Sequence, residues 1–457
     1  MLPTTVFESI VMSLNLTQFY RACNPSRTLN MSEAEGRKYY IDFSSVRSHN
    51  IIDELQANIT LFSPEKPTFQ LFTGHIGCGK TTELLRLKSI LEEEGFQVVY
   101  FDSSQGIDLA DTDIGEILLT IASYLSQSFA GFDLKSSMLI WQNLLQEAQQ
   151  IFNREFAGGS TADVSTIEIN EMKSLSFALR KMTQHAKKNP ELRVKLRQYW
   201  ESRISLILQA INTELLEPAA VAIEQQGKKG LVTIVDNLDR LETVQKPWGR
   251  SQPEYVFVDR GELLCKLSCH MVYTIPLTLI FSKDSGRLTQ RFGSAPKVLP
   301  TIPVRDRHGQ SFAPGLVQLQ QMVLARAFPD VAEDRRLALV PELFDHQQTL
   351  NRLCYISGGH ARNLLRLLHR WIEKERRLPL SRNVLEVAIR ERCRQLVLSL
   401  SEEEKGLLRQ VVEQHRISGT ENDQFLLRNL FVFEYQDDRG SWFDINPILF
   451  ESREFVL

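Results

Sequence analysis

A glycine-rich run that ends in a lysine and two threonines is the stretch of this sequence best suited to chemistry. Its residues are Gly74, His75, Ile76, Gly77, Cys78, Gly79, Lys80, Thr81 and Thr82. The spacing G-x-x-x-x-G-K-T is that of a loop whose inward-pointing backbone N–H groups cradle phosphates. Lys80 would reach the β- and γ-phosphate oxygens, and the Thr81 hydroxyl would ligate Mg²⁺. The motif predicts a site for ATP or GTP with Mg²⁺.

A second candidate residue for this site lies far downstream. Leu231–Asp236 is an apolar run that ends in an acid, as in strands buried on both faces of a parallel sheet. Ligands bind such sheets outside the carboxyl ends of the strands, so Asp236 would help Thr81 to hold Mg²⁺. The alternative is a strand-end aspartate that caps a turn.

The elements around the loop fit a strand–loop–helix–strand unit. Residues 68–73 predict a short buried strand, 82–94 a helix with one apolar side, and 96–102 the next strand. Gly95 follows the helix as its C-terminal stop. Parallel strands joined through a helix indicate an α/β fold.

Composition excludes several classes of protein. The 457 residues are 43% hydrophobic and 24% charged, with a net charge of −3, which gives no global attraction to nucleic acid or to a membrane. We read neither a signal peptide nor a membrane span. The six cysteines form no C-x-x-C pair and fit reduced thiols. We expect a cytoplasmic protein with no membrane partner.

Changes in sequence pattern divide the chain into four parts. We expect an N-terminal lead-in (1–66), a core that binds phosphate (67–310) with a helical insertion at about 130–228, an all-α lid (311–398) and a C-terminal module (399–457). The last part predicts two helices followed by a two-stranded hairpin, the pattern of a winged helix.

Several motifs together resemble a known class of ATPase. They are the glycine loop, Val235 to Arg240, the strand holding Thr274, and Ser357 to Arg362. Their order resembles that of AAA+ and STAND ATPases, especially the origin-recognition initiator type and KAP-like bacterial ATPases. The resemblance covers about residues 40–125 and 228–457. It implies a P-loop NTPase fold, ATP and Mg²⁺ as ligands, and self-association or a protein effector as partner.

The resemblance also implies roles for single residues. Arg362 corresponds to sensor 2 and would touch the γ-phosphate, and Thr274 stands where sensor 1 is expected. Either Arg287 or Arg291 would act as an arginine finger on a neighbouring subunit.

The sequence departs from the family pattern at the residue after Asp236. Related ATPases place a glutamate there, whereas this chain has Asn237, which cannot accept a proton at neutral pH. Asp239 is the nearest substitute, and it would either position water or make a structural ion pair. We therefore expect slow hydrolysis.

Local charge separates the two C-terminal parts. Residues 401–457 hold twelve acidic and six basic residues, which opposes binding to a duplex. Residues 351–400 hold eleven basic and four acidic residues, and Arg362, Arg366 and Arg370 line one helical face. This basic face predicts either ion pairs with acids elsewhere or a track for nucleic acid, and we favour the ion pairs.

We expect an ATP-binding, Mg²⁺-dependent, slow ATPase that works as a conformational or assembly switch. An ATP-dependent nucleic-acid loader that uses the basic face is the alternative. A nucleotide-binding scaffold without meaningful hydrolysis is a third hypothesis.

Overall fold

The computed structural model describes residues 15–47, 49–132, 134, 137–155 and 172–455. It divides into two compact units, each made of segments that are distant in sequence. We call residues 52–73 and 87–297 the sheet unit. Residues 1–51, 74–86 and 298–457 form the loop–lid unit, which contains the whole glycine loop.

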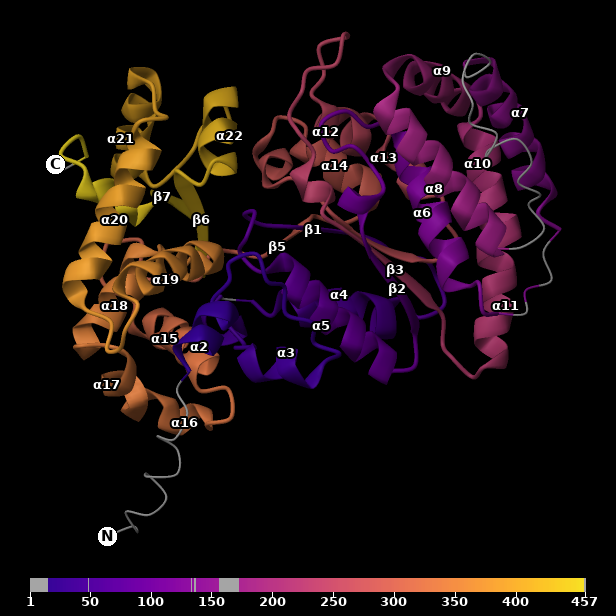
Figure 1. The fold of residues 1–457 in the computed structure, drawn as a ribbon. Helices are drawn as coiled ribbons and strands as arrows, with labels where there is room; N and C mark the ends of the chain where they lie inside the picture. The colour runs from indigo at the N-terminus through magenta and orange to yellow at the C-terminus, as the bar shows by residue number, and fades with distance from the viewer. Residues whose placement is uncertain (1–14, 48, 133, 135–136, 156–171, 456–457) are drawn as a thin grey trace. The chain divides into compact units, whose positions relative to one another are not determined.

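The sheet unit is built on a parallel β-sheet (Figure 1). Its strands are β1 (Phe69–Thr73), β2 (Gln97–Asp102), β3 (Leu231–Asp236), β4 (His270–Thr274) and β5 (Lys297–Val298). The spatial order is β2-β3-β4-β1-β5, and the β2–β3, β3–β4 and β4–β1 pairs are parallel. The α/β fold class and the parallel sheet predicted from the sequence are confirmed.

Helices cover both faces of the sheet, which explains why β3 and β4 are mostly apolar and fully buried. On one face, Gln70 of β1 donates a hydrogen bond to the Leu55 carbonyl of α4 (Ile51–Ala57) at 3.0 Å. On the other face, Tyr273 of β4 packs edge to face against Phe292 of α14 (Ser285–Phe292).

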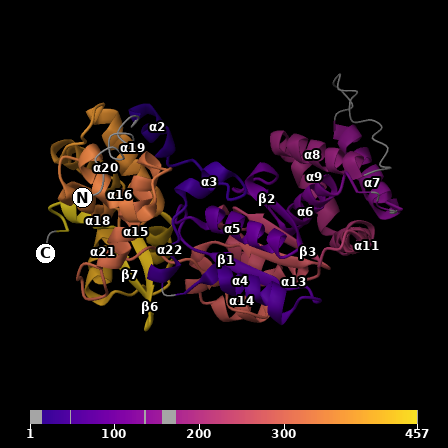
Figure 2. The same ribbon diagram turned by 90° about the horizontal axis from the view of Figure 1, so that it is seen from below.

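The described residues between β2 and β3 are mostly helical. The helices are α6 (Ile114–Ser128), α7 (Leu139–Glu155), α8 (Met172–Lys188), α9 (Pro190–Glu201), α10 (Ile204–Ala210) and α11 (Glu217–Gln225). Figures 1 and 2 both draw them as one group, and their apolar faces share a buried core with the sheet. The apolar residues that recur at helical spacing in this stretch are the ones with which the helices pack.

A wide turn accommodates the proline in this group of helices. Pro218 stands in the first turn of α11, directly after the π-helical segment Ile211–Leu216. The backbone stays helical from α10 through this segment into α11, so the N–H that proline lacks falls inside a continuous helix, next to its wider turn. The combined stretch Ile204–Gln225 is apolar and long enough to cross a membrane, but half of its most apolar window is buried inside the protein, as in ordinary core helices.

The remaining elements of the sheet unit are short. They are Ser103–Gln105, Leu238–Arg240 and Leu277–Phe281 (3₁₀), Asn58–Phe62 and Tyr255–Asp259 (π), α12 (Gln252–Glu254) and α13 (Gly261–Leu264).

The loop–lid unit is mainly helical. Its helices are α2 (Leu16–Ala22), α3 (Ala34–Tyr39), the start of α5 (Lys80–Glu93), α15 (Ala313–Ala327), α16 (Glu333–Arg336), α17 (Val340–Leu343), α18 (Gln347–Ile356), α19 (Ala361–Glu375) and α20 (Arg382–Val397), with 3₁₀ turns at Ser44–Val46 and Leu337–Leu339. The N-terminal segment packs on the lid, because Tyr20 of α2 stacks on His369 and donates to Glu373 of α19.

The C-terminal end of this unit has the element order predicted from the sequence. It contains α21 (Glu402–Gln414), α22 (Glu421–Arg428), the antiparallel strands β6 (Val432–Asp437) and β7 (Gly440–Ile445), and a 3₁₀ turn at Pro447–Glu451. Ser401 and Thr420 begin the two helices with capping boxes. The turn between β6 and β7 is bonded to the segment that precedes α15, because Arg307 forms a bidentate ion pair with Asp437.

Candidate functional site

The glycine loop has the backbone shape that its sequence predicts. Gly77 and Gly79 have φ values of +95° and +112°, which residues with a side chain rarely adopt. α5 starts at Lys80 directly after the loop, so the positive end of its dipole points into it. The Lys80 ammonium is buried and donates to the carbonyls of Gly74 and His75 at 2.6 and 2.8 Å.

Three residues that sequence reasoning missed hold the base of the loop. Arg47, which is 4% exposed, donates to the Cys78 carbonyl at 2.9 Å and lies 3.9 Å from the carboxylate of Glu83. The Tyr40 hydroxyl is 3.3 Å from both oxygens of that carboxylate. Burial raises the pKa of Glu83, and the nearby Arg47 and Arg86 oppose that rise. The loop is therefore anchored by side chains from upstream of β1.

The start of α19 lies directly against the glycine loop, within the same compact unit. The Arg362 N–H donates to the Gly77 carbonyl at 3.2 Å, and His360 Nε2 lies 3.1 Å from the Ile76 carbonyl. A Cβ placed on Gly77 would come within 2.9 Å of Arg362 Cβ and Nε, so the glycine permits this close approach. The residue predicted as sensor 2 thus lies beside the predicted phosphate loop.

The C-terminal hairpin also contacts the glycine loop. The Glu434 N–H of β6 donates to His75 Nε2 at 2.8 Å. Phe433 meets His75 edge to face and stacks on His360, with ring centroids 5.7 and 5.4 Å apart. Two carbonyls and one histidine of the loop are thus bonded to residues about 285–360 positions further along the chain.

Burial keeps the titratable groups of this contact neutral near pH 7. It lowers the pKa of His75 to about 3, and the charge of Lys80 adds to the effect. The pKa of His360 lies well below its usual value for the same reason. Burial raises the pKa of Glu434 to about 8, although the Ser441 hydroxyl donates to its carboxyl group at 2.7 Å. The contact is therefore a hydrogen-bonded apolar cluster.

The sheet unit positions Asp236 at the carboxyl end of β3. The Tyr100 hydroxyl of β2 donates to one carboxylate oxygen at 2.9 Å, and the Asn237 N–H donates to the other at 2.7 Å. Ser103 donates to the Asp236 carbonyl at 2.7 Å. Burial and the neighbouring carboxylate raise the pKa of Tyr100 above its usual range. Tyr100 was also missed from the sequence, because its contact crosses from one strand to the next.

Thr274 fixes the turn that follows Asp236. Its hydroxyl oxygen, at the end of β4, accepts the Leu238 N–H at 3.0 Å. Asn237 has a left-handed φ of +66°, a conformation that asparagine tolerates better than most residues. Asp239 is buried in the following 3₁₀ turn. Asp236, Asp239 and Thr274 are thus brought together at one edge of the sheet.

The two arginines considered as fingers are bonded within the sheet unit. Arg291 of α14 donates to the Val258 carbonyl at 2.9 Å and pairs with Glu262. Arg287 pairs with Asp284 at 3.1 Å and is half exposed. Reaching a neighbouring subunit would require either side chain to leave these partners, so the finger role stays a prediction.

The predicted site residues fall into two sets. The loop–lid unit holds the residues that would bind phosphate, and the sheet unit holds Asp236, Asp239, Thr274 and Arg291. The β1 and β3 strands run parallel on either side of β4, and the glycine loop follows β1 without a break. The loop shape, the buried lysine and Thr81 in the first turn of α5 fit a Mg²⁺-bound triphosphate.

Many charges of the basic lid face are neutralised inside the loop–lid unit. Arg370 and Lys374 pair with Glu391, and Arg352 pairs with Glu386 and Glu451. Glu386 and Glu391 belong to the same basic segment, and of these pairs Arg352–Glu451 is the one that reaches an acid elsewhere, so the ion-pair alternative stays a prediction for the rest of the face. Arg366 remains exposed, and nucleic-acid binding by this face stays a prediction.

Comparisons with known proteins give remote structural likenesses only. No protein-family model matches the chain, and no curated protein sequence does. A Walker-type ATPase of Pyrococcus abyssi is similar at 10% identity and a TM-score of 0.42, over 94% of this chain and 98% of that one. The ORC2 protein of Aeropyrum pernix is similar at 13% identity and a TM-score of 0.39, over 93% of each chain. A structure of Drosophila ORC bound to DNA is similar at 12% identity and a TM-score of 0.38, over 97% of this chain and 92% of that one. At these scores the likenesses add no argument about activity.

Proposed function

We propose that this protein binds ATP with Mg²⁺, hydrolyses it slowly, and works as a nucleotide-driven conformational or assembly switch of the AAA+/STAND type. Gly74 to Thr82 would hold the phosphates, with Lys80 on the β- and γ-phosphates and Thr81 and Asp236 serving Mg²⁺. Arg362 would contact the γ-phosphate. Mg²⁺ would supply charge neutralisation at the phosphates.

One observation carries the proposal of a switch. The loop that would grip the triphosphate is bonded to α19 through Gly77 and Ile76 and to β6 through His75. Any change of loop conformation on binding must therefore move or break these three contacts. A ligand shifts a conformational equilibrium only by its differential affinity for the two states, and these contacts provide a structural basis for such a difference.

Slow hydrolysis is supported by the turn after Asp236. Asn237 cannot act as a base, and its left-handed backbone disfavours a longer acidic side chain at this position. Asp239 is the carboxylate left on this turn to orient water.

Calorimetry with ATP and Mg²⁺ tests nucleotide binding. We expect binding by the wild-type chain and its loss in Lys80→Ala, whereas Lys88→Ala should bind normally. Lys88 lies two turns further along α5 and pairs with Glu92 on the surface, so it is a matched control. Failure of the folded wild-type chain to bind any nucleoside triphosphate would refute the proposal.

Hydrogen exchange tests the switch. A non-hydrolysable ATP analogue should change amide exchange in peptides covering β6 and the start of α19. Mass measurement in solution, with and without the analogue, would show whether assembly follows. Binding that leaves both peptides unchanged would remove the switch and leave the scaffold hypothesis.

A further inference from the structure

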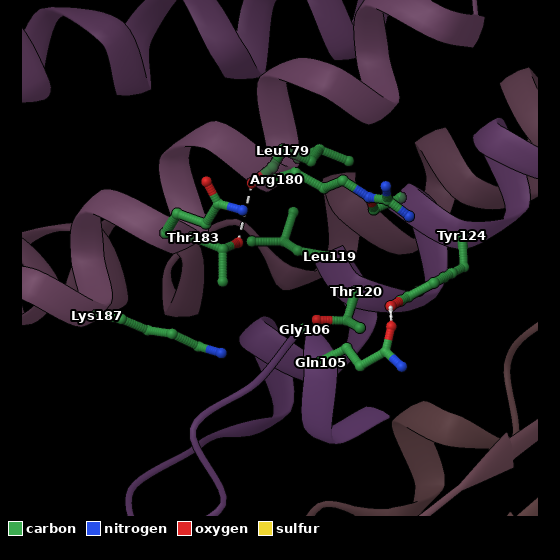
Figure 3. A pocket seen from close by; sticks show the side chains of 11 residues that line it. Gln105, Gly106, Leu119, Thr120, Tyr124, Leu179, Arg180, Thr183 and Lys187 are labelled. Atoms are coloured by element: carbon green, nitrogen blue, oxygen red, sulfur yellow. Dashed lines mark hydrogen bonds between the residues drawn. The ribbon is translucent and has the colours of Figure 1, made fainter. Parts of the chain in front are cut away.

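A polar cavity lies within the group of helices of the sheet unit, outside the residues assigned above. Its volume is about 210 Å³. It is bounded by the turn after β2, which carries Gln105 and Gly106, by α6, and by α8 (Figure 3). By the same measure a single water needs only about 10–15 Å³, so the cavity has room for a small organic molecule.

Two cations from one face of α8 line the cavity, and none of its described lining residues is acidic. Arg180 and Lys187 are seven residues apart, two helical turns, so both side chains lie on the same side of α8. In Figure 3, Lys187 extends from α8 toward Gly106 and Thr120. No hydrogen bond or ion pair engages the Lys187 ammonium among the residues that the structure describes. The nearest carboxylates, those of Asp108 and Glu116, bond Arg193 instead, and burial lowers the pKa of Lys187.

Arg180 is held in place by an aromatic stack. Its guanidinium lies 5.0 Å from the ring centroid of Tyr124 and bonds the side chain of Gln127. Tyr124 stacks on Phe101 with centroids 4.3 Å apart. A preorganised cation loses little side-chain entropy when it binds an anion.

Hydrogen-bond acceptors surround the same space. The Thr120 hydroxyl donates to the Glu116 carbonyl at 2.8 Å, and the Thr183 hydroxyl donates to the Leu179 carbonyl at 2.9 Å. Because both hydroxyl protons are committed to the backbone, these oxygens offer lone pairs to a ligand. A ligand for this cavity therefore needs negative charge for the cations and donors for the hydroxyls.

We propose that this cavity binds a small organic anion, one that carries a phosphate or carboxylate group together with hydroxyl or amine donors. Lys187 and Arg180, two helical turns apart, each contact an anionic oxygen at a different end of the ligand, and Thr120 and Thr183 accept from the donors. The site is separate from the glycine loop, so it stands whether or not the chain binds nucleotide.

Calorimetry on the full chain tests the proposal, with glycerol 3-phosphate and citrate, which both carry a hydroxyl donor, as probes at fixed ionic strength. Lys80→Ala is included in every variant so that the glycine loop does not compete for the phosphate probe. We expect one site for at least one probe, and the probe that binds identifies the anionic group preferred. Lys187→Gln and Arg180→Gln should each weaken binding about tenfold, as expected for a lost charge-assisted hydrogen bond. Lys188→Gln changes the adjacent lysine, which is exposed like Lys187 but does not line the cavity, and it should bind like its parent.

Amine acylation provides a readout that does not depend on mutation. The bound probe should protect Lys187 from a water-soluble acylating reagent and leave Lys188 reactive. Absence of binding by both probes at millimolar concentration, equal weakening by Lys188→Gln, or equal labelling of Lys187 with and without the binding probe would overturn the proposal.

Discussion

The buried carboxyl group of Glu434 makes the stability of the loop–lid unit depend on pH. Its pKa rises from the ordinary 4.5 to about 8, so between these values the folded chain holds a proton that the unfolded chain has released. Stability falls with rising pH wherever the folded state binds more protons. The loss attributable to Glu434 therefore begins near pH 4.5, grows by about 1.4 kcal/mol per pH unit and levels off near pH 8.

Glu434→Gln removes this dependence while keeping the shape of the side chain. Between pH 5.5 and 7.5 the variant should gain roughly 3 kcal/mol relative to wild type. The stability of Glu434→Gln at any single pH is less informative than this change. In wild type, Glu434 Oε2 has no hydrogen-bond partner among the described residues. An amide group of Gln at the same place would be an unpaired donor, which destabilises the variant at every pH. His75, whose pKa is lowered, stabilises the fold above about pH 6.5 and loses that contribution toward pH 3. His75 is present in wild type and in Glu434→Gln, so its contribution cancels in the difference between their free energies of unfolding.

Urea unfolding at the two pH values measures this difference. Hydrogen exchange of β6 and β7 peptides identifies the transition that belongs to the loop–lid unit. Glu413→Gln, at an exposed position of α21, is the control and should show the same stability difference from wild type at both pH values. If the difference between wild type and Glu434→Gln is also independent of pH, Glu434 is not protonated in the folded chain and the reasoning fails.

Three further predictions concern the proposed nucleotide site. Arg362→Ala should weaken ATP binding about tenfold in calorimetry, whereas Arg366→Ala, one turn further on the same helix, should not; equal effects would contradict the phosphate role. Tyr100→Phe should lower the free energy of unfolding by about 1.5 kcal/mol, and a double-mutant cycle with Asp236→Ala should show coupling of similar size. Asn237→Ala should cost about 1 kcal/mol in urea unfolding because of its left-handed backbone, and Asn237→Gly should cost less.

The parts of the site that depend on local sequence could be predicted, and those that depend on distant contacts could not. The glycine loop, the strand before it and the acid that ends β3 each carry a pattern within ten residues. Glu434 meets His75 across 359 positions of sequence, and Arg47 reaches Cys78 from an irregular segment. No periodicity records such contacts, because they arise only when the chain has folded.

The acidic hairpin shows how composition alone misleads about a surface. The excess of acidic residues over 401–457 argued against binding to a duplex, yet the structure gives one of these acids, Asp437, an internal partner in Arg307. Part of the negative charge counted there is therefore neutralised within the protein, and the charge that a partner would meet is smaller than the sequence indicates.

The discontinuity of the loop–lid unit has a consequence for synthesis on the ribosome. The glycine loop is made early, but its partners at Arg362 and Glu434 are translated hundreds of residues later. Compact units tend to fold as wholes and N-terminal parts first, so the sheet unit can mature while residues 74–86 still wait for their final surroundings. A nascent chain stalled before α19 would carry the complete glycine motif without the contacts from Arg362, His360 and Glu434 that hold it.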